Sequence, residues 1–314
     1  METNSSENPS INSRSKLSED QSLKTLRTIS YIFICIIGAL GNLLVMLATR
    51  KRRMRNVTNQ FIANLALADF TVCVITIPIS LVYTNLGHWP FRSWLCKTMP
   101  YLQGITVSAS VGTLVAIASD RFIVIVFPTK RKFRISRTWI TVVAIWLLSA
   151  AVAFPVHLYS EVTREMGDGL NVTSCIEVWP SQDGRKTYAL LLFLVLFLLP
   201  MTAISLMYAA IIYKLRTLHP TQEVTMRTHK KLVRMLVVVI VTFAVCWIPY
   251  HVTFLYLDKS DYITTEAMNA MVLFSQWLMY TNSCLNPIIY ILYNANYRRE
   301  FWKIVTCDGC GENG

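Results

Sequence analysis

Carboxylate, amide and hydroxyl side chains inside long apolar segments are the residues of this sequence that could do chemistry. Asp69 ends the run Asn64-Leu65-Ala66-Leu67-Ala68-Asp69, and other apolar segments carry Asn42, Ser110, Asn282, Ser283 and Asn286 at comparable depths. A carboxylate surrounded by neutral oxygen ligands suits a small hard cation such as sodium. A neutral, hydrogen-bonded Asp69 that serves packing alone is the alternative, and the residues by themselves leave both open.

A second group of residues could work as a switch. The pair Asp120-Arg121, followed by Phe122, falls at the end of an apolar segment. Arg121 has a planar fork of donors, which Asp120 can accept in one state and the carbonyl groups of a partner in another. Prolines inside five segments each remove a backbone hydrogen bond and permit a kink; they are Pro78, Pro155, Pro200, Pro249 and Pro287.

The segments that must position these residues have the length of membrane spans. The chain of 314 residues is 54% hydrophobic and only 15% charged. A hydrocarbon core of about 30 Å needs about 20 helical residues, and seven segments qualify: 29–49, 60–84, 99–127, 139–158, 188–213, 232–257 and 267–293. We therefore expect an all-α membrane protein, a seven-helix bundle over 29–293, rather than a soluble protein with buried helices.

The distribution of basic residues predicts the orientation. Most of the 30 Lys and Arg residues fall in the stretches 50–59, 121–138 and 214–234 and in the tail 294–314. The positive-inside rule puts these stretches in the cytoplasm, so residues 1–28 form an extracellular tail. The formal net charge of +12 is then a topology signal and a match to anionic lipid of the inner leaflet. DNA binding is a poor competitor.

Two sequence triplets on the outer side, at Asn4 and Asn171, are glycosylation acceptors, whereas Asn56 lies inside and should stay bare. Residues 1–28 lack the apolar core of a secretory signal peptide, so we expect the first span to act as an uncleaved targeting signal.

The eight cysteines divide by location. Cys96 and Cys175 are both on the oxidising outer side, where a bridge between them would pin the loop before the fifth span. Cys35, Cys73, Cys246 and Cys284 lie within spans and are interpreted as buried thiols. Cys307 and Cys310 form a lone C-x-x-C in the tail. Zinc binding or redox work would need partners that are not visible, so palmitoylation is favoured over unmodified thiols.

Taken together, residues 29–303 resemble the rhodopsin-like G protein-coupled receptors. The motifs of that family are matched by Gly41-Asn42, by Leu65 to Asp69, by Asp120-Arg121-Phe122, by Trp146, by Pro200 with Tyr208, by Phe243 with Cys246-Trp247-Ile248-Pro249, and by Asn286-Pro287-Ile288-Ile289-Tyr290. Asn296 to Phe301 is similar to the amphipathic eighth helix, which begins the last region, 294–314.

The resemblance implies a ligand-gated switch with no catalysis of its own. In such receptors the sixth helix swings about its proline, the arginine matched by Arg121 meets a heterotrimeric G protein, and the tyrosines matched by Tyr208 and Tyr290 rearrange inward. Asp69, Ser110, Asn282, Ser283 and Asn286 match the family's allosteric sodium site. Two departures matter: Phe122 replaces a commoner tyrosine, and His229 stands where many members have an acid that holds the arginine.

Single positions narrow the ligand class. No lysine for a retinal Schiff base lies in 267–293, and Gln103 replaces the acid that an amine transmitter needs. Three features resemble receptors for neuropeptide Y, neuropeptide FF, RYamide, orexin and tachykinin. They are the neutral Gln103, the stretch Cys175-Ile176-Glu177-Val178-Trp179-Pro180, and Asp258.

The resemblance thus implies an amidated peptide whose arginine meets Asp258, because carboxylate and guanidinium pair through two hydrogen bonds. The expected cavity wall comprises Ser80, Gln103, Glu177, His251, Phe254, Gln276 and Tyr280. Two alternatives stay open: a receptor of the same family for a lipid or another small molecule, and a multi-span transporter.

Overall fold

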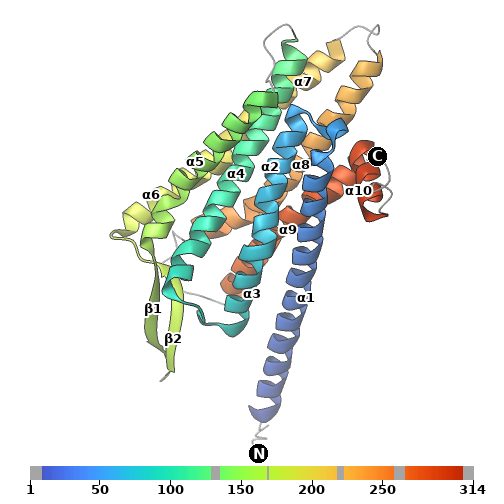
Figure 1. Cartoon of the computed structure of the whole chain (residues 1–314). Coiled ribbons are helices and arrows are strands. Elements are labelled where there is room, and N and C mark those ends of the chain that lie inside the picture. Colours follow the sequence, from blue (N-terminus) through green and yellow to red (C-terminus); the bar gives the residue numbers. More distant parts are fainter. Residues whose placement is uncertain (1–8, 129–134, 168–169, 218–222, 258–265, 307–314) are drawn as a thin grey trace, which may run out of the picture.

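The computed structural model describes residues 9–128, 135–167, 170–217, 223–257 and 266–306. Long helices run side by side in one bundle, with the N-terminus and a β-hairpin at one end and a short crosswise helix at the other (Figure 1). Because the described start of the first helix, at Pro9, lies at the hairpin end, we name this the outer end and the opposite one the cytoplasmic end, following the orientation that the basic residues predict.

Within the described residues, seven rods make up the bundle; a rod is one long helix, or two helices joined end to end by a π turn. The first is α1 (Pro9–Arg50), the second combines α2 (Val57–Thr71) with α3 (Ile77–Leu86), and the third and fourth are α4 (Ser93–Val126) and α5 (Ile135–Tyr159). The fifth combines α6 (Gln182–Phe193) with α7 (Leu199–Thr217), and α8 (Glu223–Leu257) and α9 (Glu266–Tyr293) complete it. A short 3-10 turn, η1 (Arg52–Met54), links α1 to α2. The sequence thus predicted every rod to within a few turns except the first, which begins well before residue 29.

Six of these rods are long and apolar enough to cross a membrane by length and composition, within the described ranges. The seventh rod, α9, has 28 residues but also carries Gln276, Thr281, Asn282, Ser283 and Asn286, which lower its mean hydropathy. These polar residues are largely buried against neighbouring helices. They lower the mean hydropathy of α9, although they face other helices and not the outside of the bundle.

Two of the expected proline kinks take the form of π turns. η2 (Val72–Thr76) ends directly before Ile77-Pro78, and η3 (Leu194–Leu198) ends directly before Leu199-Pro200. A proline has no N–H and its ring crowds the carbonyl group four residues earlier. The wider turn accommodates it: the amide N–H groups of Ile77 and Leu199 donate to the carbonyl groups of Val72 and Leu194.

The outer loop before the fifth rod is an antiparallel hairpin, β1 (Ser160–Gly167) with β2 (Leu170–Glu177), in which Val162 pairs with Cys175. We expected only a polar loop here. The missed signal is Asp168-Gly169, a two-residue hairpin turn sequence between two segments of eight residues.

The two ends of the chain differ in how well the expected bounds hold. α1 begins at Pro9, so most of the predicted tail 1–28 continues the first helix instead of ending before it. In the last region, 294–314, the expected eighth helix is α10 (Ala295–Val305). Tyr297 and Phe301 are buried in the bundle core, and the Tyr297 hydroxyl group donates to Asn59 Oδ1 at 3.2 Å. α10 therefore packs against α1 and α9, and a hydrogen bond ties it to the cytoplasmic end of α2.

Candidate functional site

The carboxylate of Asp69 lies in the middle of the bundle, only 3% exposed. Its Oδ1 accepts a hydrogen bond from Ser283 Oγ at 3.0 Å, and its Oδ2 accepts one from Asn286 Nδ2 at 2.8 Å. Asp69 comes from α2 and both partners come from α9, so the contact joins residues that are more than two hundred positions apart. Three of the six residues expected to surround a cation are therefore in direct contact.

Asn42 takes a different part from the one expected. Its Nδ2 donates to the carbonyl oxygen atoms of Gly38 and Ser283, at 2.9 and 2.8 Å. It thereby ties α1 to α9 beside Ser283 instead of contacting Asp69. The remaining two residues, Ser110 and Asn282, line a cavity together with Asp69 and Ser283.

The donor set of this cavity fits a small cation. The buried Oδ1 atoms of Asn282 and Asn286 have no hydrogen-bond partner among the described residues. The cavity volume is about 20 Å³, which is room for one water molecule or one small ion and not for an organic ligand. A carboxylate with unused amide and hydroxyl oxygen atoms around it is the set that sodium prefers.

The same cavity reaches Gln103, which we expected in the ligand-binding region. Gln103 lines the cavity with Trp247, Met279 and Tyr280. The Tyr280 hydroxyl group donates to Gln103 Oε1 at 3.5 Å, and Gln103 Nε2 approaches Met279 Sδ at 3.6 Å. The expected ligand anchor and the expected cation site thus line one cavity, a continuity that the sequence did not reveal.

An aromatic cluster lies on the outer side of this cavity. His251 packs against Phe193, Phe197 and Trp247 with ring centroids 4.9 to 5.9 Å apart. Phe254 packs on Tyr250 at 4.4 Å. Ser80 is a hydrogen-bond partner of the Tyr280 hydroxyl group. Gln276 is half-buried on α9, and Asp258 lies outside the described residues.

The outer hairpin is fastened across the mouth of the bundle. A disulfide bond joins Cys96 of α4 to Cys175 of β2, with the Cα atoms 5.6 Å apart, as expected. Trp89 adds a second attachment: its N–H donates to the Thr173 carbonyl oxygen at 2.7 Å, and the Thr173 hydroxyl group donates to the Trp89 carbonyl oxygen at 3.0 Å. Glu177 ends β2 exposed, where its Oε2 accepts from Trp179 Nε1 at 2.8 Å.

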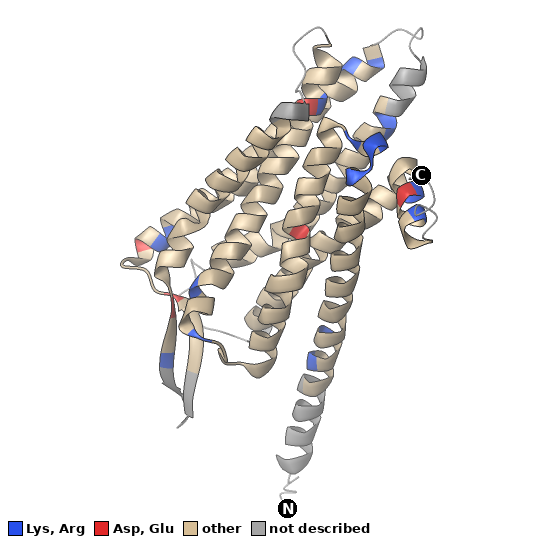
Figure 2. Ribbon diagram, in the orientation of Figure 1, with Lys and Arg blue, Asp and Glu red and all other residues tan. Residues whose placement is uncertain are grey.

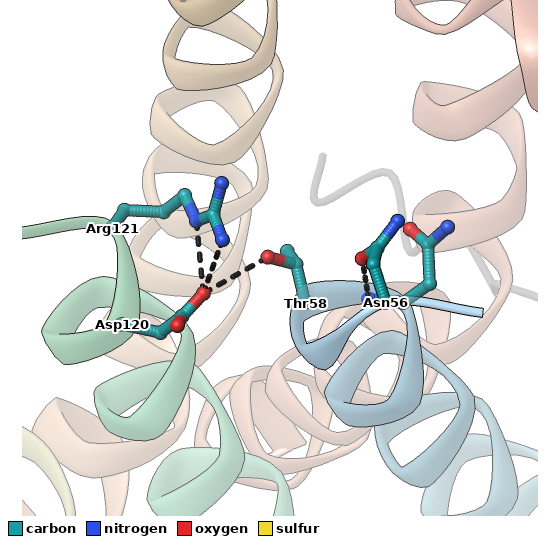
Figure 3. Close-up of polar contacts among 5 residues, drawn as sticks. Asn56, Thr58, Asp120 and Arg121 are labelled. Carbon is teal, nitrogen blue, oxygen red and sulfur yellow. Dashed lines mark hydrogen bonds and ion pairs between the residues drawn. The ribbon is translucent and has the colours of Figure 1, made fainter. Parts of the chain in front are cut away.

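At the cytoplasmic end, Asp120 holds Arg121 and is itself held by a residue that we did not single out. The Arg121 guanidinium group forms an ion pair with Asp120 Oδ2, and Thr58 Oγ1 donates to the same oxygen at 3.0 Å. Figure 3 shows Thr58 reaching across from α2 to α4. Asn56, which we expect to stay unglycosylated, caps α2: its Oδ1 accepts from the Asn59 N–H at 2.9 Å.

The other switch residues lie between these two ends. Phe243 stacks on Trp247 at 5.5 Å, and both line the cavity below Gln103. Tyr208 is buried with a hydroxyl group that has no partner among the described residues. Tyr290 stacks on Tyr297 of α10 at 5.4 Å. Pro249 and Pro287 lie inside α8 and α9.

Most of the expected modification sites lie in parts of the chain that the structure does not describe. Asn4, Cys307 and Cys310 lie outside the described residues. Asn171 belongs to β2, where its backbone pairs with that of Met166.

A bundle of long, mostly apolar helices, with an outer loop fastened by a disulfide bond and an arginine held at its cytoplasmic end, is typical of a membrane receptor of the seven-helix class. The sequence profile described as "7 transmembrane receptor (rhodopsin family)" matches residues 41–290. The chain belongs to this family, so it is a multi-pass membrane receptor and not an enzyme.

Its relatives include several peptide receptors. The chain is 34% identical to the neuropeptide FF receptor 2 of Mus musculus over 293 residues, which cover 87% of this chain and 70% of that receptor. It is 30% identical to the neuropeptide Y receptor type 6 of Mus musculus over 306 residues, 91% of this chain and 82% of the relative. The QRFP-like peptide receptor of Branchiostoma floridae is 31% identical over 299 residues, 90% of this chain and 78% of the relative.

Proposed function

We propose that this chain is a plasma-membrane receptor for an extracellular, C-terminally amidated neuropeptide and that it activates heterotrimeric G proteins. Its N-terminus is outside the cell. Relatives that are named as neuropeptide receptors, at 30 to 35% identity over most of the chain, support the peptide ligand. The basic cytoplasmic stretches support the orientation.

The observation that supports a C-terminally amidated ligand is the pair of Gln103 and Tyr280, which line the same cavity as Asp69. Both side chains are neutral, and together they present an amide and a hydroxyl group with a separation of 3.5 Å. A carboxamide has two N–H donors and one carbonyl acceptor, so it can exchange hydrogen bonds with both groups. A free carboxylate would bring a charge that neither group neutralises, and burying it there would be costly.

The ligand and the G protein would be coupled through the interior. A peptide amide at Gln103 would contact the wall that also includes Trp247, and the sodium ion would lie at the opposite wall beside Asp69. Contraction of the cavity would expel sodium and favour release of Arg121 from Asp120. Ligand and sodium thereby stabilise different conformations of one bundle.

A screen of amidated peptides on cells that express the chain tests this function, with calcium and cyclic AMP measured together. Each peptide is paired with its free-acid form as a matched control. We expect at least one amidated peptide to signal with a potency that falls at least tenfold for the free acid. A lipid that signals while the whole peptide library is silent would overturn the proposal.

A further inference from the structure

The guanidinium group of Arg27 is held in one direction at the outer end of the bundle. Arg27 lies on α1, and its Nη2 donates to Asn85 Oδ1 of α3 at 2.6 Å and to the Thr84 carbonyl oxygen at 3.5 Å. Asn85 is itself fixed, because its Nδ2 donates to Thr28 Oγ1 at 2.8 Å. The first and second rods thereby fix the orientation of a side chain that is still partly exposed.

The remaining donors of Arg27 have no acceptor among the described residues. Its Nε is buried without a hydrogen-bond partner there. Its Nη1 has no partner in that part of the chain either, and it is not buried. The neighbouring stretches 21–50, 72–95 and 267–293 contain no Asp or Glu. Because arginine stays charged, this position offers an anion both a positive charge and open N–H donors.

The position of Arg27 links it to the cavity that Gln103 and Tyr280 line. Tyr31 follows Arg27 by four residues and so lies on the same face of α1. It is 1% exposed, and its ring packs edge-on against that of Tyr280 with the centroids 5.7 Å apart. The buried Tyr31 hydroxyl group has no partner among the described residues. Arg27 therefore lies on the inward face of α1, about 6 Å further out than Tyr31, and points toward the second rod rather than toward lipid.

The charges at the outer end are unevenly distributed. Figure 2 shows basic residues on the outer part of α1 and acidic residues at the hairpin and at the start of α6. The described acids there are Glu161, Glu177 and Asp183, which have basic residues nearby in the chain. Within the described residues, the side formed by α1 and α3 has positive charge alone. A ligand that carries both signs of charge would therefore bind in one direction, with its negative group toward α1.

On the basis of the proposed peptide ligand, we propose that Arg27 binds a carboxylate side chain of that peptide and so selects peptides that contain Asp or Glu. Guanidinium and carboxylate groups form parallel, charge-assisted hydrogen bonds, and Nη1 has N–H groups available for them. Asn85 fixes the fork of donors beforehand, so less side-chain entropy is lost when the acid binds.

The structure also limits where this acid can lie in the peptide. The rings of Tyr280 and Tyr31 and about one helical turn separate the expected position of the amide from Arg27. An extended peptide spans about 3.3–3.6 Å per residue. The acid therefore lies about three to five residues before the amidated end.

The experiment uses the most potent amidated peptide from the screen, with each Asp or Glu replaced in turn by Asn or Gln. On the unmodified receptor, one replacement about three to five residues before the amide should lower the potency at least about tenfold. Arg27→Gln should weaken the parent peptide equally. With that analogue Arg27→Gln should cost less than about twofold, because both changes remove one interaction. Arg27→Glu should prefer an analogue in which lysine replaces the acid.

Arg92→Gln is the matched control, since Arg92 is an exposed arginine at the same end of the bundle, directly before α4. It should change the potency less than about twofold. Arg27→Lys should lose less than Arg27→Gln because the charge remains. Potencies are compared at equal amounts of receptor on the cell surface.

The possible failures separate this inference from the proposed function. Additive losses, an equal loss in Arg92→Gln or a potent peptide without an acid would overturn the role of Arg27 and leave the peptide receptor intact. Silence of every amidated peptide would overturn both.

Discussion

Thr58 is the residue whose role emerges most clearly from the structure, because its hydroxyl group donates to the Asp120 oxygen that also holds Arg121. A hydrogen bond to a charged group is worth about 1.5–3 kcal/mol, and 1.4 kcal/mol corresponds to about tenfold in an equilibrium. Thr58→Val keeps the shape and removes the donor, so we expect agonist-free nucleotide exchange on G protein to rise at least about tenfold.

Thr58→Ser is the control, since it retains the hydroxyl group and should keep basal exchange near that of the unmodified receptor. Rates are normalised to the amount of receptor at the cell surface. A Thr58→Val receptor whose basal exchange equals that of Thr58→Ser would show that Asp120 holds Arg121 without help from α2.

Asp69 should make agonist binding sensitive to sodium. If sodium binds beside Asp69 in the inactive conformation, linkage requires that it weaken agonist binding, and couplings between sites are typically 5- to 150-fold. We expect the affinity of the most potent peptide from the screen to fall at least about fivefold when sodium replaces potassium at equal ionic strength. Asp69→Asn should abolish the difference between the two salts. Identical affinities in both salts for the unmodified receptor would refute the site.

Asp258 is expected from the sequence to pair with an arginine of the peptide. Loss of one partner of a desolvated charge pair costs about 2–5 kcal/mol, so Asp258→Ala should weaken the arginine-containing peptide at least about 30-fold. The same substitution should matter little for a peptide in which citrulline replaces that arginine, because both changes remove one interaction. Potency measurements complete the double-mutant cycle. Additive losses would mean that the arginine binds elsewhere, with Glu177 the first acid to test.

Among the elements, the outer hairpin depends on two attachments, the Cys96–Cys175 bond and the Trp89–Thr173 hydrogen bonds. A disulfide bond typically stabilises by about 2–4 kcal/mol. Cys96→Ser and Cys175→Ser should each lower the unfolding temperature of the purified receptor and its peptide affinity. The double variant should be no worse than either single one, because one bond is lost in every case. A larger loss in the double variant would indicate separate roles for the two cysteines.

At the scale of the whole molecule, the first and second rods approach closely where Gly38 faces Cys73. A Cβ atom on Gly38 would overlap Cys73 Sγ, whereas it would lie at an ordinary contact distance of 3.5 Å from Cys73 Cβ. Small residues permit such approaches between membrane helices, and overpacking typically costs about 1–3 kcal/mol. Gly38→Ala should therefore lower the unfolding temperature, and adding Cys73→Ala should restore most of the loss.

Gly184→Ala is the matched control for that pair. Its Cβ atom would meet only Ser181 Oγ, at an ordinary 3.6 Å, and alanine favours a helix, so its unfolding temperature should not fall. If Cys73→Ala fails to rescue Gly38→Ala, the two rods are not packed through this contact.

The seven helical spans and the positions of the motif residues could be predicted from the sequence, because hydropathy over about 20 residues is a local property. The charge of the loops predicts an orientation in the membrane, which stays a prediction. The hairpin could also have been predicted from Asp168-Gly169. Local signals failed for the start of α1, where a polar sequence continues the helix.

Only the tertiary structure decided which side chains meet. The contacts of Thr58 with Asp120, Arg53 with Glu300 and Cys73 with Gly38, and the common cavity of Gln103 and Asp69, join different elements of the fold. Each depends on how far a helix is rotated about its axis and shifted along it. Rotation and shift follow from the packing of all neighbouring side chains at once, so no single segment of the sequence contains them.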